Sequence, residues 1–246
     1  MSGFRPGVAL TLISLGAVAF FCSLGVWQVR RYQWRTADLA QKSARIELPP
    51  VSLDDAARAP EDLMFRRADS RGRFELADTV LVGGVEHGRD IGYRVLTPLR
   101  LEGSADDAPR VLVDRGFIPL DQAQRFLPPD SGTGDPIEVH GLVLVLAVPE
   151  AQHGSRERRE TYFAVWNPDR PKRVQAVVDQ LPYPLLPVML LSIEPEPGGL
   201  PIGEPAKPVS PVDHRGYALT WFTVAALSLG AWVEYGRRRA RELAAE

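Results

Sequence analysis

The sequence predicts two transmembrane α-helices that flank a mainly antiparallel β domain of the α+β class, built as a small barrel or a sandwich. Residues 8–27 and 216–233 are free of charged side chains, and each run can cross about 30 Å of hydrocarbon at about 1.5 Å per residue. Between the two runs, stretches of Val, Leu, Ile and Phe alternate with turn clusters, which is typical of β-strands.

The first apolar run indicates a membrane helix that is not cleaved. A secretory signal peptide would be followed by small residues at a cleavage site, whereas this run is followed by Trp27-Gln-Val-Arg-Arg. Because only seven residues precede the helix, we expect no mitochondrial presequence and therefore a bacterial protein.

The middle of the chain is expected to form an antiparallel meander. Strands are predicted at residues 71–82, 93–101, 110–119, 137–148 and 185–193. Short helices are predicted at residues 120–127 and 173–181, and a third is predicted to begin at its cap, Ser52, with Asp55 three residues on. Residues 194–211 hold six prolines and three glycines, which favours an extended tether over a folded piece.

These patterns divide the chain into six segments. They are a cytoplasmic head at 1–7, the first transmembrane helix and its extension at 8–35, the extracytoplasmic β-rich domain at 36–193, the proline-rich tether at 194–213, the second transmembrane helix at 214–236 and a basic cytoplasmic tail at 237–246.

The distribution of charge excludes nucleic acid as a partner and favours a membrane. Residues 1–45 have a net charge of +5 and residues 214–246 a net charge of +2, while the residues between them have a net charge of −9. A nucleic-acid binder would have a basic middle, and basic flanks beside apolar runs suit anionic lipid instead. The arginines at 237–241 predict cytoplasmic termini, although Arg30 and Arg31 argue against this orientation; long domains translocate largely regardless of charge.

Few residues are candidates for catalysis, so we expect the protein not to be an enzyme. Cys22 is the only cysteine, which excludes an intramolecular disulfide and metal sites built from several thiolates. His87, His140 and His153 have no metal-ligand spacing and are expected to be solvated or hydrogen-bonded. Residues 114–116, Asp-Arg-Gly, are expected to end a strand in a tight turn held by an ion pair.

Two helix faces carry aromatic and polar side chains near the membrane surface. Spacing of about 3.6 residues places five residues on one face of the second helix: His214, Ala218, Trp221, Ala225 and Ser228. This face is suited to a flat amphipathic molecule; the alternative is an interfacial aromatic belt that only anchors the helix. In the first helix Trp27, Arg31 and Trp34 share a face, where Arg31 is placed for a ligand carboxylate or for lipid phosphates.

A hydrophobic cofactor with a central metal fits this pattern better than an active site does. Haem iron takes an imidazole as axial ligand, and its propionates favour arginine partners. If the two helices pack together, His214, Arg215, Arg30 and Arg31 meet at one interface.

Three motifs resemble the surfeit locus protein 1 family. Gly25-Val-Trp-Gln-Val-Arg-Arg-Tyr-Gln-Trp34 is similar to the family's Gly-X-Trp-Gln-X-X-Arg signature. Val111-Leu-Val-Asp-Arg-Gly-Phe-Ile-Pro119 resembles its central Val-Asn-Arg-Gly-Trp strand, with Asp114 and Phe117 in place of Asn and Trp. His214-Arg-Gly-Tyr-Ala-Leu-Thr-Trp-Phe222 resembles its His-X-X-Tyr-Ala-X-Thr-Trp-Phe motif, and the order and spacing match over nearly the whole chain.

The resemblance implies an assembly factor for haem-copper cytochrome c oxidase in the bacterial plasma membrane, with a periplasmic domain and both termini in the cytoplasm. It implies that haem a is bound transiently and inserted into oxidase subunit I, with His214 as the axial ligand. The implied partners are subunit I, the haem a synthesis enzyme and membrane lipid. The expected haem-binding residues are His214, Arg215, Tyr217, Trp221, Trp27, Arg30 and Arg31. The alternative is a membrane scaffold that stabilises an oxidase intermediate and binds no haem.

Overall fold

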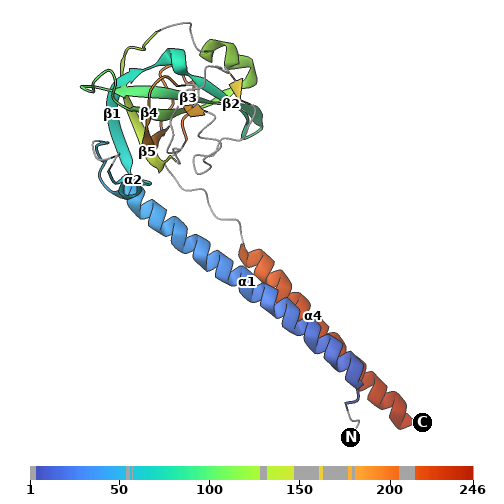
Figure 1. The fold of residues 1–246 in the computed structure, drawn as a ribbon. Helices are drawn as coiled ribbons and strands as arrows, with labels where there is room; N and C mark the ends of the chain where they lie inside the picture. Colours follow the sequence, from blue (N-terminus) through green and yellow to red (C-terminus); the bar gives the residue numbers. More distant parts are fainter. Residues whose placement is uncertain are drawn as a thin grey trace. The chain divides into compact units, whose positions relative to one another are not determined.

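The computed structural model describes residues 4–53, 56, 58–127, 132–146, 161–162, 177–178, 181–204 and 214–245. The chain forms two compact units (Figure 1). One combines Met1–Gln41 with Pro208–Glu246 and is helical, and the other, Lys42–Lys207, holds the β-strands.

The helical unit consists of two long helices, α1 (Val8–Glu47) and α4 (His214–Ala245). Both contain a window long and apolar enough to cross a membrane. Both also extend past their predicted ends at residues 35 and 236, so the predicted basic tail is helical. The added turns are rich in Ala, Leu, Arg, Gln and Glu, which favour helix, and α1 ends just before Pro49 and Pro50.

The second unit is a small barrel, one of the two predicted architectures. Its strands are β1 (Arg67–Phe74), β2 (Val80–His87), β3 (Asp90–Leu101), β4 (Arg110–Pro119), β5 (Pro136–Val145), β6 (Thr161–Tyr162) and β7 (Leu185–Ser192). The order β1-β5-β7-β4-β3-β2-β6 is closed by a further pairing of β1 with β3, which makes a five-stranded ring with β2 and β6 outside it.

The predicted meander is wrong in its strand order. β4 and β5 are not neighbours, because β7 inserts between them, antiparallel to β5 and parallel to β4. The single strand predicted at residues 71–82 is two strands, β1 and β2, separated by the 3₁₀ helix η1 (Leu76–Asp78). Apolar periodicity marks where a strand lies but carries no information about which strand lies beside it.

The short helices were predicted with mixed success. The helix predicted at residues 120–127 is the 3₁₀ helix η2 (Leu120–Phe126). The structure adds α2 (Pro60–Leu63), which begins with a proline at its first position, where no backbone donor is lost. Asp55 in the helix predicted from Ser52, and most of the helix predicted at residues 173–181, lie outside the described residues.

β4 is buried on both faces, which explains its nearly continuous apolar sequence. Val111 and Val113 face the barrel interior with Phe74 and Leu99. The alternate side chain of Leu112 belongs to a second cluster, formed by Val80, Val82, Leu96, Leu112, Leu146, Val177, Val178, Leu181, Leu185 and Met189. The layer outside the ring therefore shields β4 from water as well.

Residues 194–204, which we call the strap, fold onto the barrel, although they were predicted as part of an extended tether; the rest of the predicted tether, residues 205–213, lies outside the described residues. Ile202 forms an isolated antiparallel bridge with Phe117 of β4, with N–H···O distances of 2.9 and 2.8 Å. The Glu204 amide also donates to the Ser192 carbonyl at 2.8 Å. Proline count predicts a shortage of backbone donors, but the non-proline residues of this segment supply enough of them to bind the barrel.

Candidate functional site

Helices α1 and α4 pack side by side in antiparallel orientation (Figure 1). The pairs in contact are Trp232 with Phe4 and Thr11, Trp221 with Phe21, Phe222 with Gly25, and Arg215 with Tyr32. Residue numbers therefore rise on α1 as they fall on α4, and the start of α4 lies level with the turn of α1 around Tyr32.

Gly25 lies in a close contact between the two helices. It is the buried residue of α1, and a Cβ built on it would lie 2.7 Å from ring carbons of Phe222. Small residues allow helices to approach closely within a membrane. The first and third sequence motifs, far apart in the chain, thus pack directly on each other, and sequence analysis missed this role of Gly25. A glycine within an apolar helix is a signal of close helix packing, but Gly16 of the same helix has open space around it, so the glycine alone does not identify the contact.

The face of α4 suited to a flat molecule is occupied by α1. Ala218 and Ala225 are each only 4% exposed, and the indole of Trp221 stacks on Phe21 with centroids 5.8 Å apart and planes at 12°. In the described structure this side of α4 therefore has no room for a ligand beside Ala225. The helical spacing that grouped Ala218, Trp221 and Ala225 therefore identified the face of α4 that packs on α1.

His214 is the first residue of α4, and its backbone lies level with the turn of α1 that holds Arg30, Arg31 and Tyr32. Its side chain lies outside the described part of the structure. The neighbouring Arg215 guanidinium lies over the Tyr32 ring, 5.2 Å from its centroid, a cation–π contact between the two helices. The structure thus brings the two predicted basic clusters to the same level of the helix pair.

The remaining predicted site residues point away from the contact face. Trp27 is 57% exposed and Tyr217 is 58% exposed, and Arg30 is also exposed. The Arg31 guanidinium lies 4.8 Å from the ring centroid of Trp34, on the face predicted from their spacing. These side chains are therefore available to lipid or to a ligand at the end of the pair.

The central motif lies in β4 and holds a buried ion pair. The Asp114 side chain is 3% exposed and accepts hydrogen bonds from Arg94 Nε at 2.6 Å and from the Gly116 amide at 3.1 Å. Arg94 Nη1 donates to Glu204 of the strap at 2.6 Å. Burial raises the pKa of the Asp114 carboxyl, and the adjacent Arg94 guanidinium opposes this increase.

The motif does not end a strand in a tight turn, contrary to expectation. β4 continues to Pro119, and an irregularity in its pairing with β3 at Val95 and Leu96 accommodates Gly116, whose φ is +121°. A Cβ on Gly116 would lie 2.1 Å from the Ile202 carbonyl oxygen. Glycine is therefore required both by the backbone conformation and by the approach of the strap.

Arg115 is the second attachment point of the strap. Its Nε and Nη2 donate to the two carboxylate oxygens of Glu196 at 2.5 and 2.6 Å, and its guanidinium lies 4.8 Å from the Phe74 ring centroid. Forked pairing of this kind is the strong geometry for an arginine and a carboxylate. The expected ion pair at this motif exists, and through it the central motif binds the strap.

The described histidines have ordinary surroundings. His87 stacks on Phe117 with centroids 5.0 Å apart, and His140 Nδ1 lies 2.8 Å from Asp69 Oδ1, a hydrogen bond that raises the pKa of His140. His153 lies outside the described residues. Over the part of the chain that the structure describes, no group of three His, Cys, Asp or Glu side chains is placed to hold a metal ion.

The described residues define a class of protein with a pair of candidate membrane helices and a small β-barrel. Two of its motifs pack α1 on α4, and the central motif binds the strap to the barrel. The chain belongs to the SURF1 family, whose model matches residues 15–226.

Of three related proteins, two carry the same family name. It is 26% identical to a SURF1-like protein of Monosiga brevicollis over 94% of this chain and 88% of the relative. It is 24% identical to the surfeit locus protein 1 of Mus musculus, over 93% and 75%. It is 25% identical to the cytochrome oxidase assembly protein SHY1 of Saccharomyces cerevisiae, over 71% and 48%.

Proposed function

We propose that this protein is an assembly factor for haem-copper cytochrome c oxidase that binds haem a and assists its insertion into subunit I. The observation that carries the assembly role is membership of the SURF1 family together with the name of the yeast relative, a cytochrome oxidase assembly protein. Its direct partners are then subunit I of the oxidase and the enzyme that makes haem a.

The haem is cargo, and the residues at the start of α4 suit it chemically. Haem iron binds an imidazole, for which His214 is the candidate, and its propionates bind guanidinium groups. Arg30, Arg31 and Arg215 lie level with the His214 backbone, and the exposed rings of Trp27 and Tyr217 lie nearby along the two helices. Because the Ala218–Ala225 side is packed on α1, we propose that haem binds at this end of the helix pair and not between the helices.

The absorbance spectrum of the purified protein tests this function. The full chain is produced in cells that make haem a and purified in a mild detergent. The haem a bands are expected to co-purify with it in a defined stoichiometry. A colourless protein that still binds subunit I would support the second candidate, a scaffold without cofactor, and a colourless protein that does not bind subunit I would contradict both.

For location, we propose the bacterial plasma membrane, crossed by α1 and α4, with the barrel in the periplasm and both termini in the cytoplasm. Two helices of sufficient length and apolarity support the crossings. The arginines that end α4, at positions 237, 238, 239 and 241, support the orientation, because cytoplasmic flanks are enriched in positive charge.

Fusions to alkaline phosphatase check this topology. The reporter is active only in the periplasm, so a fusion after Ala147 is expected to be active and one after Glu246 to be inactive. The two fusions are matched for expression by immunoblot. An active C-terminal fusion with a silent internal one would reverse the orientation.

A further inference from the structure

A groove lies on the outer face of the barrel. Its volume is about 470 Å³, and it is lined by three short stretches, residues 71–73 of β1, residues 100–104 at the end of β3 and residues 136–138 of β5. Arg71, Arg73 and Arg100 all lie along it. Two carboxylates, Glu102 and Glu138, line the groove with them, so its lining holds one more cation than anions.

Two of these arginines face each other across a strand pair. Arg73 of β1 and Arg100 of β3 are register partners in the pairing that closes the ring. Residues directly opposite each other in an antiparallel pair are close neighbours, and like charges there destabilise the sheet. β1 alternates between buried and exposed positions, so Arg73 points outward and cannot be neutralised from the core.

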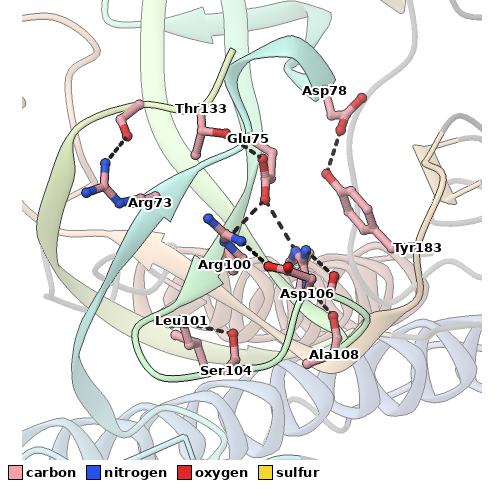
Figure 2. Close-up of polar contacts among 12 residues, drawn as sticks. Arg73, Glu75, Asp78, Arg100, Leu101, Ser104, Asp106, Ala108, Thr133 and Tyr183 are labelled. Atoms are coloured by element: carbon pink, nitrogen blue, oxygen red, sulfur yellow. Dashed lines mark hydrogen bonds and ion pairs between the residues drawn. The ribbon is translucent and has the colours of Figure 1, made fainter. Parts of the chain in front are cut away.

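The carboxylates around the groove neutralise its arginines unequally (Figure 2). Arg100 pairs with Asp106 at 2.6 Å and lies 3.8 Å from Glu75, which also serves Arg110 at 3.5 Å. Arg71 pairs with Glu138 at 3.5 Å. Within the described residues, Arg73 makes its polar contact with a backbone carbonyl, that of Gly134, at 3.2 Å. Arg73 is thus the guanidinium of this groove that lacks a carboxylate there.

We propose that this groove binds a phosphate group through Arg73 and Arg100. A phosphate monoester has three free oxygens and up to two charges, and a phosphodiester has two free oxygens and one charge, so either can accept hydrogen bonds from two guanidinium groups that flank one groove. The bound anion gives Arg73 a negatively charged partner beside Arg100, which already has Asp106. The groove is larger than one phosphate, so the group belongs to a larger molecule, either an anionic phospholipid headgroup or a water-soluble phosphate ester.

Thermal melting of the full chain in neutral detergent tests binding. Glycerol 1-phosphate is the soluble probe, with chloride at equal ionic strength as reference. It is expected to raise the melting temperature of the wild-type barrel, and Arg73→Gln should weaken its apparent affinity about tenfold or more, since a charge-assisted contact is lost. Arg125→Gln, which removes an exposed arginine of η2, is the matched control and should respond like the wild type.

A second arm distinguishes the two sources. The wild type and Arg73→Gln are placed in nanodiscs of phosphatidylcholine, with or without phosphatidylglycerol. If phosphatidylglycerol stabilises the wild type but not Arg73→Gln, the site binds a lipid headgroup. If the soluble ester stabilises the wild type in pure phosphatidylcholine, the site binds a soluble phosphate ester. Without anion, Arg73→Gln should fold about as stably as the wild type, because Arg73 is exposed and its polar contact in the described structure is with a backbone carbonyl. Equal responses of the wild type and Arg73→Gln in both arms would overturn the site.

Discussion

Replacing His214 by alanine is expected to abolish haem a binding while leaving the protein in the membrane. The substitution removes the imidazole proposed as axial ligand, and iron bound without it would have no protein ligand at this end of the helix pair. Insertion should persist, because His214 only begins α4 and no apolar residue is lost. The haem a bands of the purified variant should therefore disappear, and cells that depend on it should contain less active oxidase.

The matched control for this experiment is His140→Ala. That histidine lies on β5 and is hydrogen-bonded to Asp69, so its loss also removes an imidazole but leaves the start of α4 intact. The control should keep the haem content of the wild type. Wild-type haem content in His214→Ala, at equal protein level, would contradict the ligand assignment and favour the scaffold without cofactor.

The largest expected effect on stability comes from Asp114→Ala. Breaking a buried ion pair by removing one partner costs about 3–5 kcal/mol when the remaining charge stays buried without compensation, and because Glu204 still pairs with Arg94 we expect a loss toward the lower end of this range. Here Arg94, whose side chain is 13% exposed, would retain only Glu204, and its Nη2 is already buried without a hydrogen-bond partner. The strap should loosen with it, since Glu204 is bound through the same arginine.

Hydrogen exchange of the β4 amides measures this loss in the full chain, because those amides report on the barrel and not on the helices. Asp121→Ala, an exposed carboxylate of η2 that contacts only Gln122 among the described polar groups, is the control and should change the opening free energy by less than about 0.5 kcal/mol. A loss of under about 1 kcal/mol in Asp114→Ala would contradict this prediction, because it would show that Glu204 alone compensates the buried charge of Arg94.

The sequence predicted individual elements best where burial is most complete. The bounds of β4 match the predicted strand at both ends, because both of its faces are buried and its apolar run is continuous. The order of the strands was not predictable in this way. The side chains of β7 fit either beside β4 or at an edge, and what selects the position is the closure of the whole ring.

The candidate site was predicted in its members but not in their contacts. Helical spacing correctly grouped Ala218, Trp221 and Ala225 on one face, yet the partner of that face, Phe21 and Gly25 of α1, depends on how two helices far apart in sequence pack. The strap was missed for a related reason. Glu196 and Glu204 are bound by Arg115 and Arg94, and no local pattern links these charges.

The place of β7 in the ring imposes an order on folding. β2, β3 and β4 are joined through short connections and can pair as soon as they are synthesised, whereas β7 must reach β4 and β5 from further along the chain. Contacts of long sequence separation close large loops and form slowly. Until β7 has been made, the edge of β4 opposite β3 and the edge of β5 opposite β1 have no strand to pair with. Unpaired strand edges are prone to aggregation. A nascent chain that stalls before this point therefore presents two open strand edges to its surroundings.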